Sequence, residues 1–563
     1  MTVSDNADPL ASLDGPAGAS PVLWLEGLQV RYPGAERATL DGLDLRLAAG
    51  DRLALVGPSG CGKSTVARAV LQLLPPGSRC SGGLRLAGQD PRSLPATALR
   101  RLRGQAVGLV FQDPMTRLNP LLTIGAHLSD TLAAHRPAWA RRQVIERARA
   151  LLERVGIDPA RYGSYPHEFS GGMRQRLAIA LALSLSPPLV IADEPTTSLD
   201  VAVTAAVMRE LCDLCSEAGS ALLLITHDLA MAGRWCERIA VLDGGRLVEQ
   251  APARELLLHP GSPVGQRLVA AARAREGGRT QAAPDGAPLL VLEDLRSWHP
   301  LPSPPWQSRW VKAVDGISLQ LHRGETIGLV GASGCGKSSL CRALMGLASV
   351  RGGRVLLQGQ DLRQLRGTEL RKARRSIQMV FQDPLACLNP QMGVGEAVAD
   401  PLLLHGLATR AQARERARDQ LAAVGLEPPE RYEGRLPRQL SGGQQQRVAI
   451  ARALILQPQV LLCDESVSML DAEIQAEVLA LLRDLQRRLG LGMLFVTHDL
   501  SVASGFCHRV LVLEGGRIVE QGPGAALLAH PQAAITRTLV EACPRLPVLA
   551  GERGGQDDRP VRG

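Results

Sequence analysis

The fold is decided by a glycine-rich stretch that reads Gly57-Pro58-Ser59-Gly60-Cys61-Gly62-Lys63-Ser64-Thr65. An apolar run, residues 53–56, precedes this stretch, and a run with helix-forming character starts at Ser64. Glycine allows successive backbone N–H groups to turn towards one oxyanion, and a lysine and a hydroxyl at the end of such a loop reach phosphates and a magnesium ion. The stretch therefore predicts a nucleotide-binding loop between a buried strand and a helix, although similar loops also close ordinary turns.

A second copy of the loop argues against an ordinary turn, and it reads Gly331-Ala332-Ser333-Gly334-Cys335-Gly336-Lys337-Ser338-Ser339. It again follows an apolar run, residues 327–330. Lys63 and Lys337 belong to a set of only four lysines, and almost every other basic side chain is arginine. A compact ammonium fits between phosphates where a planar guanidinium does not. Both copies are therefore expected to bind nucleotide.

The composition is that of a large globular protein. Its 563 residues are 45% hydrophobic and 3% aromatic, and chains of this length usually form several domains of about 150 residues each. No apolar run approaches the roughly 18 residues that span a bilayer, so the chain itself is not expected to cross a membrane. Residues 1–19 lack the basic start and apolar centre of a secretory signal, which indicates a loose tail.

The charge and the cysteines favour a cytosolic protein. The net charge of +9 is spread along the chain, which is typical of a solvated surface or of weak attraction to an anionic membrane or an acidic partner, and not of nucleic acid binding. Two of the eleven scattered cysteines lie in the phosphate loops, where a disulfide would block the site, so a reducing compartment is expected. Cys212 and Cys215 form an isolated C-x-x-C, for which helix positions in the core or at the surface are favoured over a metal site.

Three further motifs of the first half have both a functional and a structural interpretation. Tyr32 closes a strand-like run and could stack on a nucleotide base or plug the end of the strand. Gln112 follows the apolar run 107–111 and could reach a metal or an attacking water, or it could simply close the strand. Ser170-Gly171-Gly172 opens a strongly helical run, where free N–H groups and the helix dipole bind anions, although the serine could be an N-cap alone.

Acidic residues and a histidine follow two neighbouring predicted strands. Asp193 and Glu194 end the apolar run 189–192, as expected at the carboxyl end of a central parallel strand. Two buried carboxylates are costly without a cation, so Asp193 is expected to hold magnesium and Glu194 to act as a general base on water. His227 ends the run 222–225 and could sense a γ-phosphate, or it could be an ordinary loop histidine.

The second half repeats these motifs in the same order. Residues 272–287 are rich in Arg, Gly, Ala and Pro without periodicity, which is typical of a linker. After this segment, the matching positions lie 270 to 274 residues downstream of the first set, at Lys337, Gln382, Ser441, Glu465 and His498. One order at nearly one spacing indicates a duplicated domain.

Both halves resemble the nucleotide-binding domain of ABC transporters almost from end to end. The resemblance rests on the phosphate loop, Gln112, the serine-glycine-glycine signature, Asp193-Glu194, Ser198-Leu199-Asp200 and His227, in the order of that family. It implies an α/β fold of two tandem P-loop NTPase domains, each with a mainly parallel sheet core, an antiparallel β subdomain and a helical subdomain. The expected organisation is a disordered N-terminal tail (1–20), a first ABC ATP-binding domain (21–271), a linker (272–289), a second ABC ATP-binding domain (290–543) and a disordered C-terminal tail (544–563).

The resemblance also assigns roles to individual residues, with ATP and Mg²⁺ as cofactors. It implies that the catalytic residues are Glu194, His227, Glu465 and His498. The magnesium site would use Ser64, Gln112 and Asp193 in the first half, and Ser338, Gln382 and Asp464 in the second. The nucleotide would contact Tyr32, the two phosphate loops quoted above, both glutamines, and the signature residues Ser170, Gly171, Gly172, Ser441, Gly442 and Gly443.

In that family two such domains pair head to tail, so that each ATP lies between the phosphate loop of one domain and the signature of the other. Lys63 would then share a site with Ser441 and Gly443, and the second phosphate loop would share a site with Ser170 and Gly172. A helix N-terminus supplied in this way could clamp the triphosphate and exclude water. Hydrolysis would then be converted into separation of the domains.

Several motifs resemble more narrowly the peptide/nickel importer group, among them Phe111-Gln112-Asp113-Pro114 with Leu118-Asn119-Pro120 and their counterparts at 381–384 and 388–390. That group imports di- and oligopeptides, glutathione, nickel or metal chelates. The resemblance implies two integral-membrane permease subunits and an extracytoplasmic solute-binding protein as partners, with the chain peripheral on the cytoplasmic face of the inner membrane. Small peptides are the first substrate expectation, and nickel or a metal chelate is the alternative.

The second half departs from this group's pattern in two ways. His299, with Trp298 beside it, stands where the first half has Tyr32, so base stacking is not carried over to the second site. Cys543 stands alone, so no iron–sulfur cluster is expected there. Both halves keep a glutamate after the aspartate, which favours two competent sites.

Two other classes of protein fit the sequence less well. Ribosome-acting factors with fused ATPase domains resemble one another in having a long charged helical linker, whereas residues 272–287 are short and aperiodic. An exporter would usually carry its own spanning helices or different residues after the glutamine. Co-purification would separate these classes, because permeases indicate an importer and ribosomes indicate a translation factor.

Overall fold

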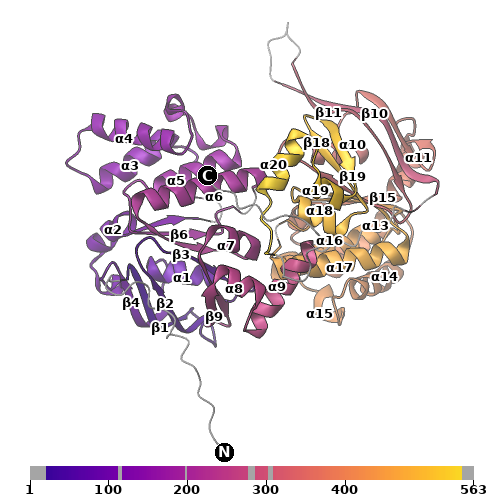
Figure 1. Ribbon diagram of the computed structural model, residues 1–563. Coiled ribbons are helices and arrows are strands. Elements are labelled where there is room, and N and C mark those ends of the chain that lie inside the picture. Colours follow the sequence, from indigo (N-terminus) through magenta and orange to yellow (C-terminus); the bar gives the residue numbers. More distant parts are fainter. Residues whose placement is uncertain are drawn as a thin grey trace, which may run out of the picture. The chain divides into compact units, whose positions relative to one another are not determined.

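The chain divides into two units, which are described one at a time (Figure 1). The computed structural model describes residues 21–111, 117–196, 199–276, 284, 286–301, 309–468 and 470–547. Unit 1 consists of residues 1–199, 203–272 and 544–563, and unit 2 of residues 200–202 and 273–543.

The centre of unit 1 is a six-stranded sheet. Its strands, in spatial order, are β5 (Val107–Val110), β6 (Leu189–Asp193), β7 (Ala221–Ile225), β3 (Arg52–Val56), β8 (Arg238–Asp243) and β9 (Arg246–Pro252). All neighbouring pairs are parallel except β8 and β9. The central strands are apolar except at their ends, as expected where both faces of a sheet are covered. Alternate residues of β3 accordingly belong to two separate hydrophobic clusters.

A smaller antiparallel sheet covers one face of this centre. Its order is β2 (Leu40–Leu47), β1 (Leu23–Arg31) and β4 (Arg79–Leu86). Leu23 pairs with Leu47 on one side and with Leu86 on the other, so three leucines meet in one row. Their inward side chains pack with those of α1 (Lys63–Val70) and one face of the central strands.

Helices form the rest of unit 1. They are α2 (Ala96–Gln105), α3 (Ile124–His135), α4 (Arg141–Arg154), α5 (Gly171–Ala182), α6 (Val201–Ala218), α7 (Leu229–Trp235), α8 (Ala253–Leu258) and α9 (Pro263–Glu276). The buried sides of α3 to α9 share one hydrophobic cluster with the second face of the sheet. Cys212 and Cys215 lie on α6 and are buried in that cluster, which agrees with the prediction that they occupy helix positions in the core or at the surface.

Unit 2 repeats the architecture. Its main sheet has the order β15 (Ile377–Val380), β16 (Val460–Asp464), β17 (Gly492–Val496), β12 (Thr326–Val330), β18 (Arg509–Glu514) and β19 (Arg517–Gly522). The antiparallel sheet has the order β11 (Trp310–His322), β10 (Pro288–Pro300), β13 (Gly352–Leu357) and β14 (Gln360–Asp361). The helices are α10 (Lys337–Leu344), α11 (Gly367–Arg375), α12 (Pro384–Cys387), α13 (Val394–Leu404), α14 (Arg410–Ala423), α15 (Glu430–Glu433), α16 (Gly442–Leu454), α17 (Ala472–Leu489), α18 (Leu500–Phe506), α19 (Gly524–Ala529) and α20 (Ala534–Ala542).

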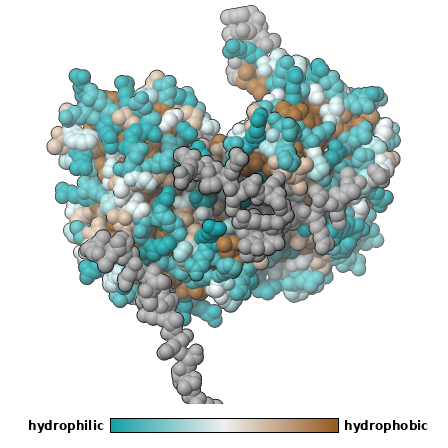
Figure 2. Space-filling view, viewed as in Figure 1, coloured by the Kyte–Doolittle hydropathy of each residue, from teal (hydrophilic) through white to brown (hydrophobic). Residues whose placement is uncertain are grey.

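The face of the molecule shown in Figure 2 is mainly hydrophilic on both units, with apolar residues scattered over it. Within the part of the chain that the structure describes, no helix combines the length and the apolar character needed to span a bilayer.

The expected α/β class with parallel and antiparallel sheets is confirmed, and two segment expectations are wrong in detail. Helix α9 continues to Glu276, so residues 272–276, expected in the linker, are helical. The C-terminal tail was expected to be disordered from residue 544, but Leu546 is buried in the helical core of unit 1. Gln112, Thr197 and Ser198 lie outside the described residues, as does the N-terminal tail.

Candidate nucleotide-binding sites

Each phosphate loop connects the end of a central strand to the start of a helix, β3 to α1 in unit 1 and β12 to α10 in unit 2. Gly62 has φ 109° and Gly336 has φ 112°, a region that residues with a Cβ rarely adopt. A Cβ on Gly62 would lie 2.9 Å from the carbonyl oxygen of Thr39, and a Cβ on Gly336 would overlap the carbonyl oxygen of Ala313. Both positions therefore require glycine.

The loop lysine is buried in both units. Lys63 Nζ donates hydrogen bonds to the carbonyl oxygens of Gly57 (2.8 Å) and Pro58 (2.9 Å). Lys337 Nζ bonds the first two carbonyl oxygens of its own loop at 2.7 and 2.9 Å. Each ammonium also lies 3.9 Å from the sulfur of its loop cysteine, Cys61 or Cys335. A buried ammonium is costly unless it is paired with an anion, and an anionic phosphate at the loop would be such a partner. The loop geometry and the lysine together fit a nucleoside triphosphate.

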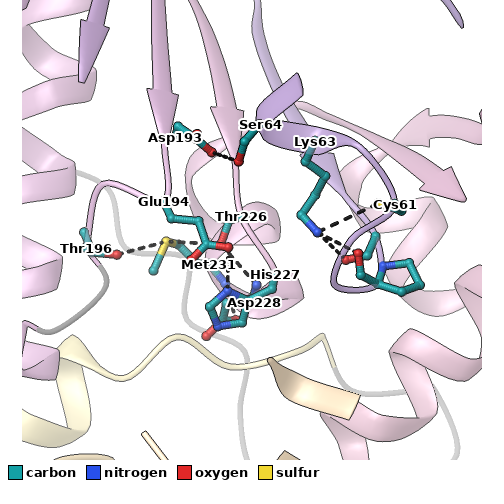
Figure 3. A network of polar contacts seen from close by, with 12 residues as sticks. Cys61, Lys63, Ser64, Asp193, Glu194, Thr196, Thr226, His227, Asp228 and Met231 are labelled. Carbon is teal, nitrogen blue, oxygen red and sulfur yellow. Dashed lines mark hydrogen bonds and ion pairs between the residues drawn. The ribbon is translucent and has the colours of Figure 1, made fainter. Parts of the chain in front are cut away.

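A serine and an aspartate meet beside each loop. Ser64 Oγ donates to Asp193 Oδ1 at 2.9 Å, and Ser338 Oγ donates to Asp464 Oδ1 at 2.9 Å (Figure 3 shows the first pair). Burial raises the pKa of both aspartates, and the serine hydrogen bond opposes that increase only in part. A bound cation would remove the cost of burying these carboxylates in their charged form.

The donor set of each pair fits Mg²⁺. Hydroxyl and carboxylate oxygens are the hard ligands that Mg²⁺ prefers, and this ion takes few protein ligands when phosphates and water supply the rest. Among the described residues, no group of three or more His, Cys, Asp and Glu side chains is placed to hold a metal on its own.

A glutamate and a histidine lie next to the aspartate in each unit. His227 Nδ1 is 3.1 Å from Glu194 Oε1. In unit 2, His498 Nδ1 is 3.7 Å from Glu465 Oε2, and Gln382 Nε2 donates to the same oxygen at 3.0 Å. The sequence therefore identified residues that the fold brings together, because β6 and β7, like β16 and β17, are parallel neighbours that end at one edge.

Both glutamates have a left-handed backbone, with φ 47°. Such a conformation is uncommon for a residue with a long side chain and persists where the surroundings impose it. Here the N–H of Glu194 is held by the carbonyl of Ile225 (2.9 Å), and the N–H of Glu465 by the carbonyl of Val496 (3.0 Å). Each carboxylate is thus aimed from a fixed bend at the end of its strand.

The charge of Glu465 is favoured at neutral pH. Burial raises the pKa of this carboxyl, but the contact with His498 and the positive charge of Lys337 outweigh burial, so its pKa lies below the ordinary value. A group that must accept a proton from water has to be ionised first, and this environment meets that requirement.

The two signature serines are helix caps. Ser170 Oγ accepts a hydrogen bond from the N–H of Met173 (3.4 Å) at the start of α5. Ser441 Oγ accepts from the N–H of Gln444 (3.4 Å) at the start of α16, and Gln444 Oε1 accepts from the N–H of Ser441 in return (3.1 Å). Both serines are therefore N-caps, and the first N–H groups of a helix have no partner within the helix, so an anion-binding role remains compatible with capping.

The two candidate base positions differ. Tyr32 lies beside the phosphate loop, with its hydroxyl 3.1 Å from Thr65 Oγ1. His299, its counterpart in the second half, is exposed, and the neighbouring Trp298 ring lies under the ammonium of Lys312 at 5.0 Å. The two sites therefore offer a nucleotide base different surroundings.

Sequence reasoning missed part of the support behind the first site. Asp228 caps α7 by accepting hydrogen bonds from the N–H groups of Ala230 (2.9 Å) and Met231 (3.0 Å), which fixes the turn that carries His227. An aspartate directly before an apolar helix is a recognisable capping signal. The contacts that Met231 makes through its sulfur have no such signal in the sequence.

The same loop, acidic pair and histidine recur at the same edge of equivalent sheets, which is the arrangement of P-loop nucleoside triphosphatases. The chain belongs to the ABC transporter family, whose model matches residues 40–197 and 314–468. Both units are therefore ATP-binding domains of that family, and the protein is an ATPase.

Three relatives align over almost their whole length. The peptidoglycan transport ATP-binding protein YejF of Agrobacterium fabrum is 39% identical over 535 residues, covering 93% of this chain and 96% of the relative. The glutathione import ATP-binding protein GsiA of Pectobacterium atrosepticum is 39% identical over 534 residues, covering 88% and 85%. An uncharacterised ABC transporter ATP-binding protein YejF of Escherichia coli K12 is 41% identical over 535 residues, covering 92% and 99%.

Proposed function

We propose that this protein is the ATP-hydrolysing subunit of an importer of small peptides. Two observations together support the proposal: the phosphate loop, acidic pair, histidine and signature serine occur in both units, and relatives are named for import of glutathione or transport of peptidoglycan. Glutathione is a short peptide, and peptidoglycan contains short peptides, so the shared chemistry of these cargoes is a small peptide. The chain itself has no contact with cargo in this proposal, because permeases form the path.

We assign the chemistry to the residues of each site as follows. The loop N–H groups and the lysine hold the triphosphate, with Lys63 and Lys337 leaving their loop carbonyls for phosphate oxygens. Glu194 and Glu465 accept a proton from the attacking water, and His227 and His498 hold the γ-phosphate side of each site. Ser64 with Asp193, and their counterparts in unit 2, would hold Mg²⁺. When bound, this ion offsets the negative charge of the phosphates.

The signature helices are assigned to the opposite site. Ser441 and Gly443 would complete the site of Lys63, and Ser170 and Gly172 that of Lys337. A capped helix start offers N–H groups and a positive dipole end to a γ-phosphate, and this interaction is lost on hydrolysis. Gln112 and Gln382 are assigned to the metal and the attacking water, and Tyr32 to the base.

The partners follow from the transport role. We propose two integral-membrane permease subunits and an extracytoplasmic solute-binding protein, with this chain at the cytoplasmic face of the inner membrane. Nucleic acid has no role in this proposal, since the charge of +9 is spread over 563 residues without a dominant basic cluster.

Uptake by the whole complex tests the proposal. The protein would be co-expressed with its permeases and binding protein, purified as a complex and reconstituted in liposomes. Labelled di- and tripeptides, including glutathione, should accumulate only with ATP and the binding protein present. Accumulation of Ni²⁺ or a nickel chelate in place of peptides would contradict the peptide assignment, and purification with ribosomes in place of permeases would contradict transport altogether.

A further inference from the structure

A methionine sulfur lies behind the first site, between the two loops that carry Glu194 and His227. Thr196 Oγ1 donates a hydrogen bond to Met231 Sδ at 3.6 Å, and Thr226 Oγ1 approaches the same sulfur at 4.0 Å (Figure 3). All three side chains are buried, with exposed fractions of 8% for Met231, 7% for Thr196 and 3% for Thr226. The sulfur is thus the acceptor for two buried hydroxyl groups.

These contacts close a ring around the proposed catalytic pair. Glu194 is two residues before Thr196, and His227 directly follows Thr226. The Glu194–His227 contact of 3.1 Å joins the two loops on the nucleotide side, and Met231 joins them on the core side. Thr226 Oγ1 already accepts the N–H of Asp228 at 3.1 Å, so its own proton is directed to another acceptor.

The second site is built differently at the same positions. Val467 and Val502 stand where Thr196 and Met231 stand in the first half, and both valines are buried. Within the described residues, Thr497 Oγ1 has the counterpart of the capping bond, from the N–H of Asp499 (3.1 Å). In the loop after Glu465, the hydroxyl of Ser468 donates to the Glu465 carbonyl at 2.8 Å.

We propose that Met231 is a positioning residue for ATP hydrolysis at the first site, and that the second site does not depend on such a residue. A thioether is a weak acceptor, but it is flexible and fits where two hydroxyls from different loops converge. Without the sulfur, the buried hydroxyl of Thr196 loses its acceptor, and its loop must shift to find another. Such a shift moves Glu194 and His227 relative to each other. This inference rests on the roles proposed above for those two residues.

The decisive variant is Met231→Leu, which keeps the volume and removes the acceptor. In the full chain carrying Glu465→Gln, so that only the first site turns over, we expect kcat to fall by about three- to tenfold, the effect of one or two weak hydrogen bonds. KM for ATP should change less than twofold, because the phosphate loop is not touched. In the Glu194→Gln background the same substitution should leave turnover unchanged.

Two controls separate positioning from general destabilisation. Met208→Leu changes another buried methionine, on α6, whose side chain lies in the apolar cluster, and it should leave kcat unchanged in both backgrounds. The double variant Thr196→Val with Met231→Val introduces the residues of the second site. It also removes the Thr196 hydroxyl, which has lost its acceptor in Met231→Val, so the double variant should be more active than Met231→Val alone.

Amide hydrogen exchange provides a test that needs no turnover. In the nucleotide-free full chain, Met231→Leu should speed exchange in the peptide 226–232 at least threefold and leave the peptide 497–503 unchanged. Unchanged exchange, or an equal loss of kcat from Met208→Leu, would overturn the inference. If Glu194→Gln in the otherwise natural chain left turnover intact, the proposed function of the first site would fail instead.

Discussion

At the scale of single residues, the phosphate loop depends on glycine for two separable reasons. Gly62 and Gly60 both have positive φ, 109° and 78°, but only Gly62 has a neighbouring backbone within reach of a Cβ. We expect Gly62→Ala to destabilise the protein by about 1–3 kcal/mol and to weaken ATP binding more than tenfold, because strain and the clash with Thr39 add. Calorimetric titration with ATP and urea unfolding would measure both effects.

Gly60→Ala is the matched control for that variant. No atom lies within 4 Å of a Cβ placed there, so only the backbone strain remains and the effect should be clearly smaller. If Gly60→Ala and Gly62→Ala lowered ATP affinity and stability equally, the clash with Thr39 would have no part in the requirement for glycine.

Individual site residues were largely predictable, because their chemistry is local. A lysine in a glycine loop, an acidic pair after a buried strand and a serine before a helix are each recognisable from the few residues around them, and the structure places them as those residues indicate. The thioether contacts of Met231 were not predictable, since they arise where two loops meet and Met231 is an ordinary apolar letter in the sequence. The same holds for the left-handed backbone of Glu194, which the fold imposes.

At the scale of elements, a carboxylate on α15 ties this short helix to α14. Glu433 accepts hydrogen bonds from Arg418 Nε (2.7 Å) and Arg414 (3.0 Å). The hydrogen bond from Arg418 lowers the pKa of Glu433 to about 2, whereas an unfolded glutamate has a pKa of about 4.3. A pKa that is lower in the folded state stabilises the protein above about pH 4.3, and this contribution is lost as the pH falls towards 2.

Glu433→Gln should therefore lower the urea midpoint of unit 2 at pH 7, with the difference from the natural chain shrinking below pH 4 and disappearing near pH 2. Glu430→Gln on the same helix is the control, because Glu430 is exposed and acts on Arg418 through its charge, with no hydrogen bond within the described part of the chain. A difference that stayed constant from pH 7 to pH 2 would contradict the ion-pair explanation.

The elements themselves followed the sequence closely where periodicity was strong. The apolar run expected to form a strand at 189–192 lies in β6, and Ser170 and Ser441 cap the starts of α5 and α16. The end of α9 was missed because Ala, Arg and Glu at 272–276 were judged by their lack of an apolar stripe, although all three are strong helix formers. Intrinsic propensity prevailed there over the hydrophobic pattern.

At the scale of the whole molecule, two sets of proposed catalytic side chains predict two working sites. Glu194 and Glu465 share the same backbone bend and a neighbouring histidine. We expect Glu194→Gln and Glu465→Gln each to lower ATP turnover at least tenfold at the altered site while ATP still binds, since only the proton acceptor is removed. Single-turnover hydrolysis and ATP binding, measured on each variant and on the double variant, would check this.

If one of these variants abolished all turnover and the other had no effect, the two-site hypothesis would fail. The duplication was evident from the spacing of the motifs, and so was the replacement of Tyr32 by His299 at the candidate base position. The replacement of Met231 by Val502 became interpretable only with the neighbouring side chains in place.

The burial of Leu546 in the helical core of unit 1 makes the first unit discontinuous along the chain. A gene fragment that ends near residue 272, the boundary expected from the sequence, would therefore encode unit 1 without the side chain of Leu546 in its core. During synthesis, unit 1 can complete its core only after all of unit 2 has emerged from the ribosome.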